Sequence, residues 1–238
     1  MPATTPSGGG LDLSMLATRK RARDVIRTLK RRYPRDTEPP PGGITDHLAA
    51  VLIDRDAGGY DAYRATGKLL EEFVDWNEVR VARWGEIERV VRPFVREGRS
   101  GEAARRLVYA LQLVFQARGD LNLDLLARSS PIDARKFLLS LNCLDQDEVN
   151  LILLLGLGEP VMPVDSDVLR AGKRLGVISH TATKLQAQRS LEVALEGEDL
   201  HACYVALREH ARRVCFTNSP ECGDCPLKGG CRYGSEMH

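Results

Sequence analysis

The chain has 238 residues, of which 43% are hydrophobic and 28% are charged, as expected of a globular protein with a core. Its net charge of +1 singles out no class of partner, so the placement of the charges matters more than their sum. The longest apolar run, Leu151 to Leu155, is too short to cross a membrane, and the N-terminus lacks the pattern of a secretory signal. We therefore expect a cytoplasmic protein, in which disulfides are rare.

Helical patterns follow one another along the chain. After residues 1–11, which we expect to be a disordered tail, apolar and basic residues alternate with helical spacing from Leu13 to Tyr33. Runs of alternating β-branched residues are absent, so we predict an all-α fold. Further helices are predicted around residues 45–52, 60–73, 79–84, 87–95, 102–116, 131–141, 147–155, 166–175, 185–195 and 200–214.

Four of the six cysteines are clustered near the C-terminus. A predicted helix delivers the first, and a loop rich in proline and glycine brings the others back towards it. Four thiolates bind either a zinc ion or an iron–sulfur cluster. Zinc sites usually pair two closely spaced knuckles, and only one such pair is present here, so the spacing favours the cluster and leaves zinc as the alternative. The spacing is Cys215-x6-Cys222-x2-Cys225-x5-Cys231, while Cys143 and Cys203 are interpreted as isolated, buried thiols.

A second motif places an acidic residue before the predicted helix at 166–175. In Pro163-Val164-Asp165-Ser166-Asp167, the side chain of Asp165 is positioned to accept backbone N–H bonds at the helix N-terminus. On these residues alone we favour a plain N-cap. The same geometry, however, places a carboxylate where it can face a developing sugar cation, as in glycosidic cleavage. Asp167 is interpreted as an ordinary acid of the first turn.

Together the two motifs resemble those of the endonuclease III family of DNA glycosylases. The resemblance includes the cysteine spacing, His210 before the first cysteine, and the V-D-S-x-V-x-R segment followed by R-L-G. It extends from about Pro131 to Cys231. It implies a 4Fe-4S cluster on the four cysteines, Asp165 as the catalytic carboxylate, and double-stranded DNA as the partner, with the damaged base extruded to reach the site.

The resemblance also implies the architecture. We expect two helical domains flanking a DNA cleft, in a monomer associated with the nucleoid. One is a six-helix domain, residues 45–159, with a degenerate helix-hairpin-helix segment. The other is a discontinuous iron–sulfur cluster domain made of residues 12–44 and 160–238.

The chain departs from the family at the hairpin. The matching stretch, Leu141 to Asp147, lacks both hairpin glycines; Asn142 and Asp145 are expected to make the turn, and Asn142 to contact DNA. The negative charge of Asp145 should weaken phosphate binding there. The family's lysine is replaced by Asp147, which cannot form a Schiff base. We therefore predict a monofunctional base-excision repair glycosylase with little AP lyase activity.

Basic residues supply the remaining predicted DNA contacts. Arg55 lies near the place where the family has a glutamine that enters the DNA stack, and Arg170, Lys173 and Arg212 lie near the two motifs. The helix from Leu13 to Tyr33 is either a solvated face or a phosphate-facing surface. Two other functions remain open: a non-catalytic or weakly active lesion sensor of the same fold, and a zinc-bound DNA-binding module. The sequence does not distinguish among oxidised pyrimidine, uracil and a mismatched base as substrate.

Overall fold

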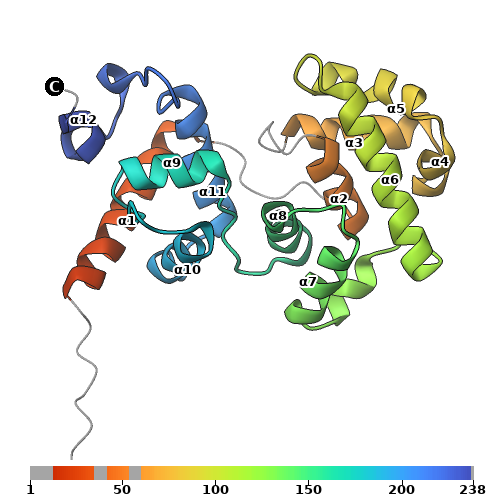
Figure 1. Ribbon diagram of the computed structural model, residues 1–238, viewed down its shortest axis with the longest axis horizontal. Helices are drawn as coiled ribbons and strands as arrows, with labels where there is room; N and C mark the ends of the chain where they lie inside the picture. The colour runs from red at the N-terminus through yellow and green to blue at the C-terminus, as the bar shows by residue number, and fades with distance from the viewer. Residues whose placement is uncertain (1–12, 35–41, 54–59, 237–238) are drawn as a thin grey trace, which may run out of the picture.

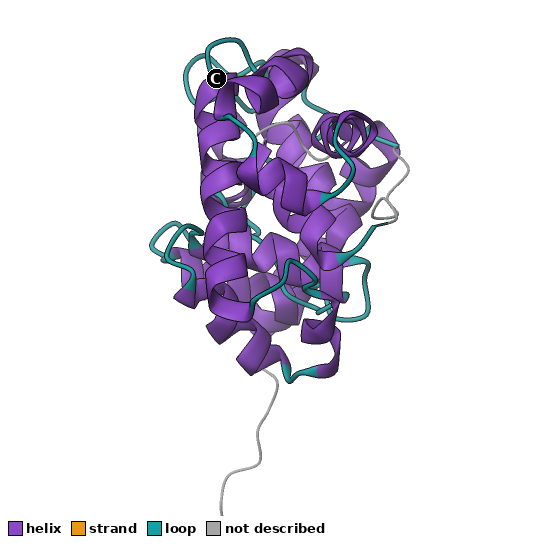
Figure 2. Ribbon diagram, turned by 90° about the vertical axis from the view of Figure 1, so that its right-hand side faces the viewer, coloured by secondary structure: helices purple, strands orange, loops and turns teal. Residues whose placement is uncertain are grey.

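The computed structural model describes residues 13–34, 42–53 and 60–236, and these residues form helices and connecting loops without strands (Figure 2). The all-α prediction is confirmed. No described helix combines the length and the apolar composition needed to span a bilayer. The predicted N-terminal tail and Arg55 lie outside the described residues.

One group of helices joins the two ends of the chain. Helix α1 packs against α10 and α11, and α9 packs against α11 (Figure 1). The apolar face of α1 is buried at Ala22, Val25, Ile26 and Leu29. The helices are α1 (Leu13–Arg32), α9 (Ser166–Arg174), α10 (Lys184–Ala194), α11 (Leu200–Arg213) and α12 (Arg232–Glu236), with the short 3₁₀ turns η3 (Cys222–Asp224) and η4 (Lys228–Gly230).

The second group surrounds α2, which is buried at nine of its ten residues. Helix α2 packs against α3, α6 and α8, and α8 also contacts α11 of the first group. The predicted domain limits at 44/45 and 159/160 remain a prediction. The elements are α2 (Ile44–Ile53), α3 (Tyr60–Glu72), α4 (Trp76–Val81), α5 (Trp84–Val91), η1 (Arg92–Phe94), α6 (Ser100–Arg118), η2 (Asp124–Arg128), α7 (Pro131–Ser140) and α8 (Gln146–Leu157).

The predicted helices around residues 79–95 begin and end elsewhere. Helix α4 begins at Trp76 because Asp75 caps it by accepting the backbone N–H of Glu78. Helix α5 begins at Trp84, since Glu86 reaches back to the backbone N–H of Arg83. Trp84 therefore opens a helix, although the sequence predicted that it would end one.

The basic side chains of α1 are partly used inside the protein. Arg21 donates 3.0 and 2.8 Å hydrogen bonds to the carbonyl of Leu175. Arg23 donates to the carbonyls of Ala194 and Glu196 at 3.2 and 2.9 Å. These carbonyls lie at helix C-termini, where cations are stabilising. These two arginines therefore bind α1 to the C-terminal ends of α9 and α10. A phosphate-facing role stays a prediction for the other basic residues of α1.

Candidate active site and cysteine loop

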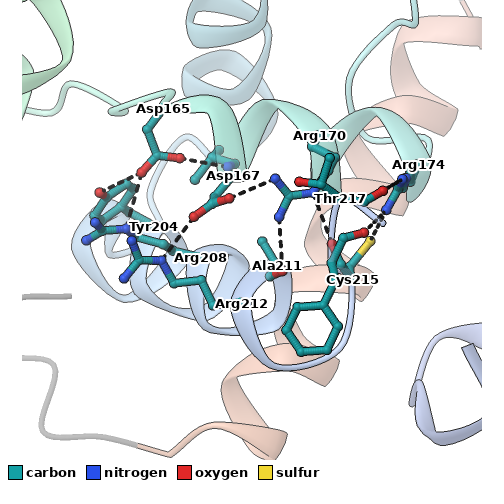
Figure 3. Close-up of polar contacts among 12 residues, drawn as sticks. Asp165, Asp167, Arg170, Arg174, Tyr204, Arg208, Ala211, Arg212, Cys215 and Thr217 are labelled. Carbon is teal, nitrogen blue, oxygen red and sulfur yellow. Dashed lines mark hydrogen bonds and ion pairs between the residues drawn. The ribbon is translucent and has the colours of Figure 1, made fainter. Parts of the chain in front are cut away.

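Asp165 lies at the N-cap of α9, as predicted. Its extended backbone lets Oδ1 accept the backbone N–H of Val168 at 2.8 Å. Two side chains of α11 approach the other oxygen: the Tyr204 hydroxyl donates to Oδ2 at 3.1 Å, and Arg208 Nε forms an ion pair with it at 3.2 Å (Figure 3). Tyr204 and Arg208 are buried, at 3% and 4% exposure. The carboxylate is therefore fixed from two helices, which a plain surface cap does not require.

Tyr204 is a hydrogen-bond donor at the pH of ordinary assays. Burial raises the pKa of its hydroxyl, and the negative charge of Asp165 and the hydrogen bond to it raise that pKa further. Neither Tyr204 nor Arg208 was singled out from the sequence, because their role depends on how α11 packs against α9.

Asp167, the ordinary acid of the prediction, joins α9 to α11. It accepts from Arg170 Nη1 at 2.7 Å and from Arg212 Nε at 3.0 Å (Figure 3). Burial alone would raise the pKa of Asp167, but the hydrogen bonds and charges of the two arginines outweigh it and lower that pKa. Arg170 also donates to the carbonyls of Cys215 and Ala211, both at 3.0 Å. Asp167 therefore has a structural role.

The residues predicted to contact DNA differ in exposure and in the partners of their side chains. The side chains of Arg170 and Arg212 are only 18% and 24% exposed and are both paired with Asp167. Lys173 lies half-buried in the last turn of α9. Asn142 has a left-handed backbone with φ +55°, as its turn position predicted, and its side chain donates to the Ser140 carbonyl at 3.1 Å. These positions do not test whether any of the four residues contacts DNA.

In the hairpin between α7 and α8, the backbone amides at the start of α8 are hydrogen-bonded to side chains of the same segment. Asp145, expected to help make the turn, is the extended N-cap of α8 with φ −87°. Its carboxylate accepts the backbone N–H groups of Asp147 and Glu148 at 3.0 and 2.9 Å, and its own backbone N–H donates to Glu148 Oε2 at 2.9 Å. Arg106 holds Glu148 at 2.8 Å. The amides that an anion would use at a helix N-terminus are therefore occupied.

Asp147, which the sequence resemblance aligns with the family's lysine, is 8% exposed and lines a cavity of about 590 Å³. Lys184, the first residue of α10, places its Nζ 2.5 Å from Asp147 Oδ2. Val164, which directly precedes Asp165, lines the same cavity. Lys184 was missed from the sequence because no local pattern connects it to a residue 37 positions earlier.

The cavity is also lined by polar side chains of α7, α8 and α10. Asn150 is 1% exposed and accepts from Arg135 at 2.6 Å and from Gln146 at 3.1 Å. Its amide group donates to Gln188 at 3.0 Å. This network fixes the side chains Arg135, Gln146 and Gln188, which line the cavity.

The four C-terminal cysteines are free thiols in a loop held by α9. Arg174 lies 3.6 Å from Cys215 Sγ and donates to the carbonyls of Phe216 and Thr217 at 2.5 and 3.0 Å (Figure 3). Cys231 Sγ lies 3.3 Å from the Arg174 carbonyl oxygen. Arg174 therefore contacts the loop near both its first and its last cysteine.

The donors of the loop are four thiols, the ligand type that both zinc and iron–sulfur clusters take. Burial raises the pKa of Cys225, a hydrogen bond from the Leu227 N–H lowers it, and the nearby Cys231, Cys215 and Cys222 raise it again. These three cysteines therefore lie within electrostatic reach of Cys225, and a bound iron or zinc would offset the negative charge of the four thiolates. In the described part of the chain, no group of three or more His, Cys, Asp or Glu side chains is placed to hold a single metal ion. Of the two isolated cysteines, Cys203 is buried as predicted and Cys143 is half-buried.

Curated relatives are similar over most of the chain, although no protein-family model matches it. DNA glycosylase/AP lyase ROS1 of Arabidopsis thaliana is 24% identical over 198 residues, 76% of this chain and 14% of that protein. Endonuclease III of Thermotoga maritima is 23% identical over 211 residues, covering 88% of this chain and 92% of that one. Endonuclease III of Bacillus subtilis is 31% identical over 87 residues, 37% of this chain. The chain thus spans about a seventh of the length of the plant relative ROS1.

Solved structures share the fold. A trapped endonuclease III–DNA covalent intermediate aligns with a TM-score of 0.69 and 20% identity, covering 92% of this chain and 98% of that one. A thermostable thymine-DNA glycosylase aligns with the same TM-score of 0.69 and 17% identity, covering 94% of this chain and 99% of that one.

Proposed function

We propose that this chain, which belongs to the endonuclease III-like family of DNA glycosylases, hydrolyses the N-glycosidic bond of a damaged base in double-stranded DNA. One observation carries the proposal: the carboxylate of Asp165 is fixed by Val168, Tyr204 and Arg208, and Val164, the preceding residue, lines a cavity of about 590 Å³. A plain N-cap needs only the first of these partners.

The fixed carboxylate suits the charge that develops during the reaction. Breaking the bond between C1′ and the base nitrogen leaves positive charge on the sugar, and a preorganised carboxylate stabilises it without rearranging. The base leaves the DNA stack to reach the cavity. Asp165 therefore stabilises the sugar cation and orients the attacking water.

The reaction is proposed to end at base removal. Asp147 cannot form a Schiff base, and the ammonium of Lys184 is paired with Asp147 at 2.5 Å and is not a nucleophile in that form. Borohydride should therefore not trap the protein on lesion-bearing DNA. Efficient trapping, tested with Lys184→Gln beside the wild type, would overturn this part of the proposal.

The four cysteines Cys215, Cys222, Cys225 and Cys231 are proposed to hold a 4Fe-4S cluster. Such a cluster would cross-link the loop that Arg174 fastens to α9. Its role in this proposal is structural and close to DNA. A purified protein that is yellow-brown and contains iron and sulfide would support the cluster, whereas a colourless protein containing zinc would contradict it.

Contacts with the DNA backbone are proposed for Asn142, Lys173 and Arg55. Arg170 and Arg212, which are both paired with Asp167, would add positive charge near the DNA. The protein would act as a monomer on chromosomal DNA. A non-catalytic lesion sensor is the second candidate, because the carboxylate of Asp145 occupies the hairpin amides. It predicts duplex binding without release of any base.

The decisive experiment measures single-turnover base release from duplexes containing uracil, thymine opposite guanine, or thymine glycol. Asp165→Asn should lower the rate by about 10²-fold or more, because asparagine preserves the cap but removes the charge. Asp199→Asn is the matched control, since Asp199 caps α11 through the N–H of Ala202 at 3.0 Å. Wild-type rates in Asp165→Asn would refute its catalytic role, and release of no base by the wild type would favour the sensor.

A further inference from the structure

A second aspartate lies near Asp165, in a cavity that the residue before Asp165 also lines. Asp147 lines it directly, and Val164, the neighbour of Asp165 along the chain, lines it as well. Asp147 lies in the first turn of α8 and Asp165 caps α9, and the negative charge of Asp165 acts on Asp147. Two neighbouring carboxylates in different surroundings can divide the work, one stabilising charge and the other moving a proton.

We infer that Asp147 is the general base that takes a proton from the attacking water, and that Lys184 is a positioning residue that holds Asp147 in place. The inference rests on the proposed function, because it assigns a step of the same hydrolysis. It gives a task to the carboxylate that stands where the family has a lysine.

The contacts of the two carboxylates separate their roles. Asp165 receives Val168 N–H at Oδ1, and Tyr204 and Arg208 at Oδ2. A carboxylate so engaged keeps its orientation but has little capacity left for a proton. Within the described ranges, the side-chain partner of Asp147 is Lys184 on Oδ2, which leaves Oδ1 to accept one.

The charges around Asp147 favour proton transfer. Burial raises the pKa of its carboxyl, the hydrogen bond and charge of Lys184 lower it, and the negative charges of Asp145 and Asp165 raise it again, with a net increase. The remaining charged groups of the cavity are Arg135 on α7, and Arg189 and Glu192 on α10. Because a carboxylate with a raised pKa is a stronger base than an ordinary aspartate, the surroundings suit general-base catalysis.

The step balances without another reactant. The water oxygen forms a bond to C1′ while the bond from C1′ to the base nitrogen breaks. The base leaves with that electron pair and takes a proton from solvent. The water gives its proton to Asp147 Oδ1, which returns it to solvent after the products leave. The products are the free base and a sugar with a hydroxyl group at C1′.

The test compares base release by the full-length protein across pH, using the duplexes with uracil, thymine opposite guanine, or thymine glycol. Asp147→Asn should slow release by about 10²-fold, and Asp147→Glu should restore part of the rate because it keeps a carboxyl group. Asp133→Asn, at an exposed acid of α7, is the matched control and should retain the wild-type rate.

The pH profile separates a base from a structural group. A general base must be ionised, so activity falls as the pH decreases through the pKa of Asp147, which burial raises. Lys184→Gln removes the charge that lowers that pKa, so the acid limb should move to higher pH. In Asp147→Asn the limb should disappear, while duplex binding measured by fluorescence anisotropy stays at least as tight as in the wild type.

Three results would overturn the inference. Asp147→Asn with the wild-type rate would exclude a catalytic role. A slow Asp147→Asn variant that keeps the wild-type acid limb would show a structural role instead. If the wild type releases no base from any of the three duplexes, both this inference and the proposed function fail. If the wild type is active, Asp165→Asn is inactive and Asp147→Asn is unaffected, only this inference fails.

Discussion

The N-termini of α8 and α9 carry the same cap residue in different surroundings. Asp145 caps α8, and the Glu148 side chain accepts the backbone N–H of Asp145, so both hydrogen bonds of this cap lie within one turn. Asp165 caps α9, but its second oxygen is held by Tyr204 and Arg208 from α11. A local capping box satisfies its own donors. A cap held from another helix has a fixed position relative to that helix, and this difference separates a structural aspartate from a candidate catalytic one.

The largest effect is expected from breaking the closed cap. Glu148 is 1% exposed on its side chain and pairs with Arg106, which is 34% exposed. Glu148→Ala removes the capping box and leaves the arginine without this partner, so the free energy of unfolding should fall by about 3 kcal/mol. Urea unfolding would measure it. Glu102→Ala, which breaks an exposed pair with Arg99, is the control and should cost under about 1 kcal/mol. Equal losses would remove the distinction.

A smaller effect tests the anchored cap. Tyr204→Phe deletes only the hydroxyl that donates to Asp165 at 3.1 Å. A hydrogen bond to a charged group contributes about 1.5 kcal/mol, so base release should slow by about tenfold, with duplex affinity unchanged. Tyr109→Phe, at a side chain that is 55% exposed, is the matched control. If both variants release base equally fast, α11 does not position Asp165.

The smallest effect concerns binding at the hairpin. Asp145→Ser preserves a cap residue and removes its negative charge. Duplex affinity should rise by about threefold at low salt and by less at high salt, because screening weakens the contribution of a charge. Fluorescence anisotropy across a salt series would measure this. An unchanged affinity at every salt concentration would indicate that DNA does not approach the N-terminus of α8.

Local patterns were sufficient to predict most of the helices and the cap at Asp165, because periodicity and capping depend on residues within one turn, but they misplaced α4 and α5 and missed α12. The left-handed backbone of Asn142 was also predictable from its turn position. Contacts between distant segments were not. The pairing of Lys184 with Asp147 and the use of Arg170 by carbonyls of α11 and the loop depend on tertiary packing. The predicted roles of the cysteines and of Asp165 remain predictions.

Helix α9 does two jobs with nine residues. Asp165 begins it, and Arg174 at its end fastens the cysteine loop. A helix of this length spans only about 14 Å and behaves as a rigid rod. A disturbance of the loop at one end is therefore transmitted as a tilt of the carboxylate at the other. Substitutions within α9 must therefore preserve its straightness as well as its polar contacts and its buried face, and a proline in its middle would misalign both ends at once.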